Sequence, residues 1–255
     1  MRYPYVKLHS GPARQRLSGT ALKRIACITM FIDHIGASCL EAGILLPAIT
    51  TGAAGYGGIP VSTLLAVDQL LRYIGRLAFP LFCFLLVEGF LHTHDAKRYV
   101  QRLLLFGCIS ELPFDLAFFR TPFTLQYQNV YWTLALGLLA MAGIRHFETP
   151  AGSSTSKGVL CACACALAAQ LAHTDYGAIG VMLIAALYIT RADRKKQCIV
   201  GAAMMLYELT APLAFVLVWF YSGQRGACGK VQQRVFYWFY PVHIAVLAGI
   251  TNLML

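Results

Sequence analysis

Long, uninterrupted blocks of apolar residues dominate the pattern along this chain. They show neither the alternation of a half-buried strand nor the single apolar stripe of an amphipathic helix. Blocks of about 20 apolar residues are typical of helices that cross a bilayer. We therefore expect an all-α, polytopic transmembrane helix bundle. The pattern predicts spans near residues 22–41, 70–91, 99–119, 130–147, 158–172, 176–190 and 235–254.

Two further stretches are not simple spans. Residues 43–67 carry no charge and are rich in Gly and Pro, so we interpret them as an outer re-entrant or interfacial segment. Residues 197–222 would be about 39 Å long as one helix, enough for one span and short for two. We predict two short helices that meet near the sequence YELTAP. The total is then about nine membrane segments.

The composition agrees with a membrane environment and excludes an ordinary soluble domain. Of the 255 residues, 58% are hydrophobic and only 13% are charged, whereas soluble domains carry about 25% charged residues. No repeat of 20 to 50 residues is visible, so residues 22–255 are interpreted as one transmembrane domain behind a basic tail, 1–21.

The basic residues predict the orientation of the spans. Lys and Arg accumulate in cytoplasmic loops, so the N-terminus and these linkers are expected on the cytoplasmic side. The net charge of +10 then belongs to a collar at the membrane surface and implies no nucleic acid. The tail lacks a small-residue cleavage site and is interpreted as retained. The basic linkers are 1–24, 92–102, 145–157, 191–196 and 223–234.

Two of the seven histidines, His34 and His243, lie well inside predicted spans. His34 is eleven residues past Lys23, a helical rise of about 16 Å, and His243 lies about 12 Å into the last span. In a hydrocarbon layer about 30 Å thick, both are near the middle. Ionisable residues at this depth usually mark a functional site, and we expect the two to share one. The alternative is that each makes a structural hydrogen bond between helices.

Asp33 precedes His34 directly but points to another side of the helix, because neighbours on a helix do not face each other. We therefore expect Asp33 to pair with a cation from another helix, and Arg76 is the candidate. The alternative for Arg76 is that its long side chain reaches out to the membrane surface.

Other polar residues lie in the outer half of the predicted bundle. Glu111 and Asp115 share one helical face, with Pro113 between them loosening the helix. These paired carboxylates would bind an amine, move protons or form a structural contact. Asn129 and the pair Asp175–Tyr176 lie at outer helix ends. There Asp175 could cap a helix, and tyrosine is common at membrane interfaces.

Five motifs, in order, resemble the TraX family, named for the enzyme that acetylates the N-terminus of conjugative F pilin. The resemblance runs from about residue 22 to the C-terminus. In addition, Lys23 and His34, with ten residues between them, resemble the basic-x10-His motif of integral-membrane acyltransferases. The motifs are LKRIACITMFIDHIGA, GRLAFPLF, QNVYWT, DYGAIGV and FYWFYPVHIAVL.

The resemblance implies transfer of an acetyl group from acetyl-CoA, in the bacterial cytoplasmic (inner) membrane, to an amine or hydroxyl acceptor such as a pilin, another peptide or a glycan. His34 would be the general base. His243 would be a second acid or base, or would polarise the thioester carbonyl. Asp33 and Arg76 would hold the geometry and charge of the site. No metal is expected.

The remaining candidates are assigned to the two substrates. The candidate acceptor-binding residues are Glu111, Asp115, Asn129, Asp175, Tyr176 and Tyr240. Cations near the cytoplasmic entrance would attract the CoA phosphates, namely Lys23, Arg24, Arg98 and Arg102. Two other functions remain open: a proton-coupled transporter, since buried ionisable residues also relay protons, and a non-catalytic partner in pilus assembly.

Overall fold

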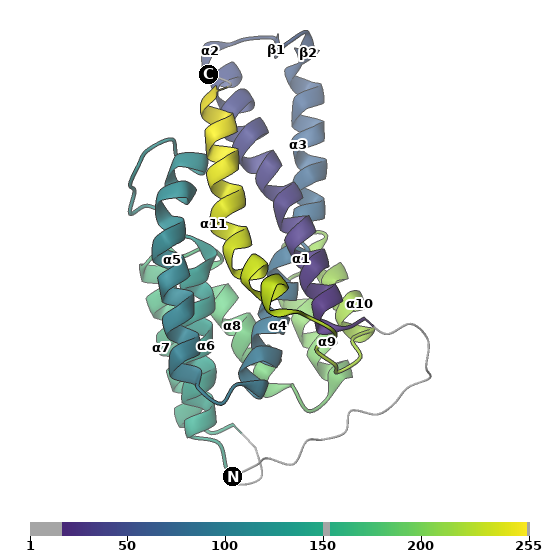
Figure 1. The fold of residues 1–255 in the computed structure, drawn as a ribbon, viewed down its shortest axis with the longest axis vertical. Coiled ribbons are helices and arrows are strands. Elements are labelled where there is room, and N and C mark those ends of the chain that lie inside the picture. The colour runs from purple at the N-terminus through teal and green to yellow at the C-terminus, as the bar shows by residue number, and fades with distance from the viewer. Residues whose placement is uncertain (1–16, 150–153, 254–255) are drawn as a thin grey trace.

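The computed structural model describes residues 17–149 and 154–253, which are mostly helical (Figure 1). Most of the basic tail, including Arg2, Lys7, Arg14 and Arg16, lies outside the described residues. Several helices begin at a polar side chain that accepts a backbone hydrogen bond: Ser18 before the first helix, Asn129 before the sixth. Such caps satisfy N–H groups that have no partner within the helix.

The first helical hairpin is longer than expected. The α-helix α1 (Gly19–His34), the π-helix η1 (Ile35–Leu45) and the short α2 (Leu46–Thr51) form one continuous helix. A two-stranded turn follows, β1 (Gly55–Tyr56) paired with β2 (Ile59–Pro60). The next helix, α3 (Val61–Gly75), returns alongside α1 (Figure 1).

Residues 43–67 are more helical than expected, and their position relative to the membrane stays a prediction. They are the end of one long helix, a tight turn and the start of the next helix. Several glycines of this stretch lie in the turn, where Gly57 and Gly58 have φ of 58° and 81°. A two-residue hairpin with positive φ at both central positions favours glycine. The flanking apolar residues remain helical.

The remaining helices form the body of the bundle, and the first of them is separated from α3 only by a short break. The break at Arg76–Leu77 divides α3 from α4. The helices are α4 (Ala78–His92), α5 (Ala96–Phe118), α6 (Val130–His146), α7 (Ser156–Leu171), α8 (Gly177–Ile189), α9 (Arg194–Met204), η2 (Ala211–Leu213), α10 (Ala214–Trp219) and α11 (Lys230–Leu253).

Residues 194–219 confirm the prediction of two short helices that meet near YELTAP. α9 rises for about 16 Å before the chain turns back into η2 and α10. Neither helix is long enough to cross a hydrocarbon layer of about 30 Å. The turn between them lies beside the break between α3 and α4, where Glu208 and Thr210 contact Arg76 and Tyr73.

The packed core lies between α4, α6, α8 and α10, where Leu81, Phe84, Leu138 and Ile184 are fully buried. By contrast, α3 buries only Leu64 and Gly75, so most of its apolar surface is exposed. Within the described residues, three helical stretches are long and apolar enough to cross a membrane: Gly19–Thr51, Val61–His92 (α3 and α4 together) and Val231–Leu253. An exposed apolar surface on such helices is typical of a membrane protein.

Candidate active site

The structure brings together the two histidines that lie 209 residues apart in the chain. His34 is the last residue of α1, where the π-helix begins, and His243 lies on α11. Nδ1 of His34 is 2.7 Å from Nε2 of His243, and the rings are nearly parallel, at 8°. π-helical segments are frequent at functional sites.

Aromatic rings surround this histidine pair. Phe118 and Tyr240 stand edge-on to His34, with ring centroids 5.4 and 5.8 Å away. Phe31 and Phe239 contact the ring of His243. Nδ1 of His243 lies 2.5 Å from the backbone carbonyl oxygen of Phe239. The pair is therefore held in an apolar setting by two short hydrogen bonds.

Asp33 pairs with Arg72 rather than with Arg76, which corrects the expected ion pair. Its Oδ2 is 2.6 Å from Nη1 of Arg72. The two helices approach closely here, because a Cβ on Gly75 would overlap the Asp33 side chain. The expectation failed because residues 43–51 extend the first helix and so change which turn of α3 lies level with Asp33.

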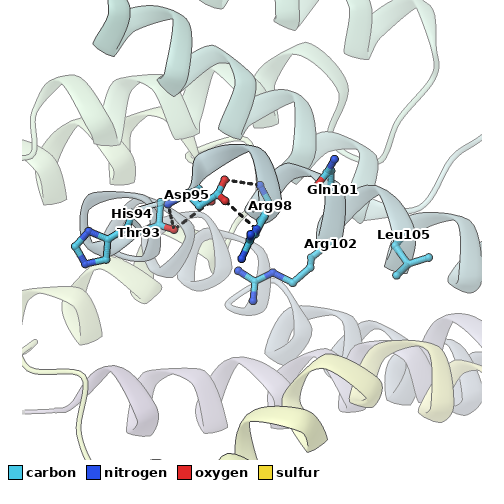
Figure 2. A pocket seen from close by; sticks show the side chains of 7 residues that line it. All are labelled: Thr93, His94, Asp95, Arg98, Gln101, Arg102 and Leu105. Atoms are coloured by element: carbon cyan, nitrogen blue, oxygen red, sulfur yellow. Dashed lines mark hydrogen bonds and ion pairs between the residues drawn. The ribbon is translucent and has the colours of Figure 1, made fainter.

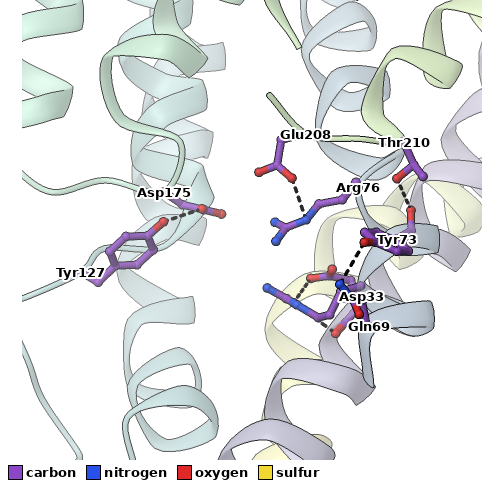
Figure 3. Close-up of polar contacts among 9 residues, drawn as sticks. Asp33, Gln69, Tyr73, Arg76, Tyr127, Asp175, Glu208 and Thr210 are labelled. Atoms are coloured by element: carbon purple, nitrogen blue, oxygen red, sulfur yellow. Dashed lines mark hydrogen bonds and ion pairs between the residues drawn. The ribbon is translucent and has the colours of Figure 1, made fainter. Parts of the chain in front are cut away.

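Arg76 instead pairs with Glu208, at the tip of the α9–α10 hairpin, with Nε 2.8 Å from Oε2 (Figure 3). Nearby, the Thr210 hydroxyl donates to the backbone carbonyl of Tyr73 at 2.5 Å. Sequence reasoning missed both Arg72 and Glu208. An acidic residue in the apolar YELTAP turn was the available signal for Glu208, while Arg72 had none apart from its position one turn before Arg76.

Asp175 and Tyr176 lie between α7 and α8. Figure 3 shows Asp175 beside Tyr127, to the left of Arg76 and Glu208. Asp175 accepts a hydrogen bond from the Tyr127 hydroxyl at 2.9 Å and does not cap α8, which begins after Tyr176. Burial raises the pKa of the Asp175 carboxyl to about 6, and the bond from Tyr127 partly offsets this. The ring of Tyr176 stacks on Phe79.

Glu111 and Asp115 share a face of α5 as expected, but they contact different partners. Oε2 of Glu111 accepts hydrogen bonds from Asn129 and Trp132, at 2.5 and 2.9 Å. Oδ2 of Asp115 accepts from the backbone N–H of Thr124 at 2.9 Å. The segment between α5 and α6 folds back toward the two carboxylates, and each carboxylate is bound by different groups.

Two of the four candidate CoA-binding cations line one cavity, of about 510 Å³, at the end of the bundle that carries the loops 93–95 and 220–229. We call it the basic cavity. Lys23, Arg102 and Arg225 face it, together with the rings of Tyr99, Phe236 and Tyr237. The Lys23 ammonium lies 4.8 Å from the Phe236 ring centroid, a distance typical of a cation–π contact.

The other two cations lie outside the basic cavity. Arg98 borders a shallower cavity of about 530 Å³, which also includes Arg102, and pairs there with Asp95 at 3.0 Å (Figure 2). Arg24 faces Gln232 on α11. Within residues 17–149 and 154–253, no group of three or more His, Cys, Asp or Glu side chains is arranged to hold a metal ion.

The family model described as TraX protein matches residues 18–251, nearly the whole chain. The chain belongs to the TraX family. This TraX-family chain is also 33% identical over 267 residues to the probable fimbrial assembly protein FimC, serogroup H1, of Dichelobacter nodosus, covering 91% of the chain and 95% of that relative. No solved structure matches it.

Proposed function

We propose that this TraX-family protein is an acetyltransferase that acts in fimbrial or pilus assembly. It crosses the bacterial cytoplasmic membrane several times, with its N-terminus and basic linkers inside. It transfers an acetyl group from acetyl-CoA to an amine or hydroxyl acceptor. The observation that carries the proposal is the contact of His34 and His243 within the aromatic cluster. The role in assembly rests on the similarity to the probable fimbrial assembly protein of Dichelobacter nodosus.

The basic cavity has the charges and aromatic surfaces expected of a site for acetyl-CoA, the acetyl donor. Three cations offer charge to the phosphates of CoA, and three aromatic rings offer surface to its adenine. Lys23, Cys27 and His34 lie on one face of α1, at spacings of four and seven residues. From Lys23 to His34 the helix rises about 16 Å. In this proposal the pantetheine arm follows that face, and the thioester reaches the histidine pair.

The proposed reaction is a direct transfer. The acceptor nitrogen or oxygen forms a bond to the thioester carbonyl carbon, and the carbon–sulfur bond breaks. The acceptor proton passes to His34 as general base and then to the departing thiolate, so that free CoA and the acetylated acceptor are the products. The neighbouring charged residues form two ion pairs and so carry no net charge: Asp33 with Arg72, and Arg76 with Glu208.

One observation favours a second candidate, a proton-coupled transporter. The break between α3 and α4 and the half-length α9–α10 hairpin bring Arg76 and Glu208 together inside the bundle. Interrupted helices that meet ionisable groups at depth are typical of substrate sites in secondary transporters. The two candidates differ in whether the thioester of acetyl-CoA is broken.

The test is acetyl transfer by the purified protein in nanodiscs. Acetyl-CoA labelled on the acetyl group is supplied with a synthetic peptide that carries the free N-terminus of a fimbrial subunit, and the same peptide with a blocked N-terminus is the control. We expect labelled peptide and free CoA in equal amounts, with none from the blocked peptide. Proton-dependent uptake by proteoliposomes, without any release of CoA, would favour the transporter.

A further inference from the structure

The two hydrogen bonds of His243 determine which nitrogen of each ring carries a proton. A backbone carbonyl only accepts, so Nδ1 of His243, 2.5 Å from the Phe239 oxygen, must donate. A neutral imidazole has one N–H, which leaves Nε2 of His243 as an acceptor. Nδ1 of His34, 2.7 Å away, must then donate to it. The remaining nitrogen, Nε2 of His34, keeps its lone pair.

This assignment requires both rings to be neutral, and their surroundings favour that form. The rings around the pair belong to Phe31, Phe118, Phe239 and Tyr240. In the described part of the chain, neither histidine forms an ion pair with a carboxylate, and the adjacent Asp33 is engaged by Arg72. A buried charge without a partner is costly, so the imidazolium is disfavoured at rest.

Nε2 of His34 is also the one nitrogen of the pair that no other group engages. It has no hydrogen-bond partner among the residues that the structure describes. His34 is partly buried, whereas His243 is 6% exposed. The unengaged nitrogen of the pair is thus the one that carries a lone pair, and it belongs to the more exposed ring.

We propose that His34 accepts the acceptor's proton at Nε2, and that His243 is a positioning residue that fixes this tautomer. The proposal rests on the proposed acetyl transfer. The acceptor N–H or O–H bond breaks as the proton bonds to Nε2 of His34. The resulting imidazolium is stabilised by its Nδ1–H bond to His243, which the Phe239 carbonyl orients. The proton then moves to the leaving thiolate. His243 neither gains nor loses a proton.

Two substitutions of His243 separate positioning from acid–base chemistry. In His243→Gln an amide oxygen can accept from Nδ1 of His34 but cannot exchange a proton, and in His243→Leu no acceptor remains. General-base catalysis contributes about 10²–10⁴-fold. We expect His243→Gln to retain kcat within about tenfold and His243→Leu to lose about a hundredfold, with an unchanged KM for acetyl-CoA. An equal, large loss in both variants, or full activity of His243→Leu, would overturn the proposal.

A spectroscopic measurement tests the tautomer without relying on activity. The whole protein, labelled with ¹⁵N-histidine in nanodiscs, is examined by solid-state NMR, and His34→Gln identifies the His34 signals. We expect a protonated Nδ1 and a bare Nε2 for His34 in the wild type and in His243→Gln, and mixed tautomers in His243→Leu. A protonated Nε2 in the wild type would refute the assignment. The expected tautomer together with no acetyl transfer would refute the proposed function and leave the assignment of the protons supported.

Discussion

Asp33 and His34 are neighbours on α1, yet they belong to two polar regions of opposite character. Asp33 faces α3 and joins a charged layer of two ion pairs, Asp33–Arg72 and Arg76–Glu208. His34 faces α11 and joins a neutral pair of imidazoles among aromatic rings. One helix serves both regions because consecutive side chains point in different directions.

The two regions are expected to serve different purposes: the ion pairs stabilise the fold, and the histidine pair carries out the chemistry. In the charged layer each charged group is paired with one of opposite sign, so removing one leaves a partly buried charge unpaired. In the neutral pair one nitrogen remains unengaged, so removing it costs a reactive lone pair and only one hydrogen bond. Substitutions on the Asp33 side should therefore act on the free energy of unfolding, and those on the His34 side on the rate.

The largest expected effect is on the neutral side. His34→Gln should lower kcat by about 10²–10⁴-fold, because the general base is lost. Its melting temperature in nanodiscs should remain close to that of the wild type. His146→Gln, a histidine at the end of α6 away from the pair, is the matched control. Near-normal transfer combined with a sharply lower melting temperature would make His34 a structural bridge.

On the charged side, Asp33→Asn should destabilise the protein by about 2 kcal/mol, less than for a fully buried pair because both side chains are partly exposed. The change is isosteric, so the narrow space beside Gly75 is kept. The double variant Asp33→Asn/Arg72→Gln should regain part of the loss, since the unpaired guanidinium is removed. Unfolding in denaturant measures both. Losses that simply add would show that the ion pair is not the cause.

Substitutions in the basic cavity should affect only the binding of acetyl-CoA. Lys23→Gln and Arg102→Gln should each raise the KM for acetyl-CoA about tenfold, as expected for the loss of one charge-assisted phosphate contact. Neither should change kcat. Arg98→Gln should have a smaller effect, because that side chain is largely exposed and already pairs with Asp95. A loss of kcat with a constant KM would show that acetyl-CoA does not bind in this cavity.

The smallest effect concerns the anchor of the α9–α10 hairpin. Thr210→Val removes the hydrogen bond to the Tyr73 carbonyl and should cost about 1 kcal/mol of stability. Thr210→Ser keeps the hydroxyl and is the control. The rate per folded molecule should be unchanged in both variants. A loss of activity in Thr210→Val at constant stability would connect the hairpin directly to catalysis.

The sequence predicted most of the helices, apart from those within residues 43–67, and the meeting of His34 with His243, because depth along a helix follows from counting residues. It also predicted the two short helices near YELTAP. It did not predict the partner of Asp33. The level of Arg72 or Arg76 relative to Asp33 depends on the register between two helices, and the turn at 52–60, with helix on both sides of it, sets that register.

The outer carboxylates show a second limit of the sequence. The spacing of Glu111 and Asp115 correctly placed both on one face of α5. It could not show that the backbone of Thr124 would bind Asp115 while Asn129 and Trp132 bind Glu111. Those contacts depend on how the segment between α5 and α6 folds back, which has no helical period to follow.

The most direct measurement of the central claim compares Asp33→Asn and His34→Gln in one assay. Initial rates of acetyl transfer are measured in nanodiscs, at a temperature where both variants remain folded, and are expressed per folded molecule. We predict that Asp33→Asn stays within about tenfold of the wild type while His34→Gln falls by at least about a hundredfold. The reverse order, with His34→Gln the more active variant, would contradict it.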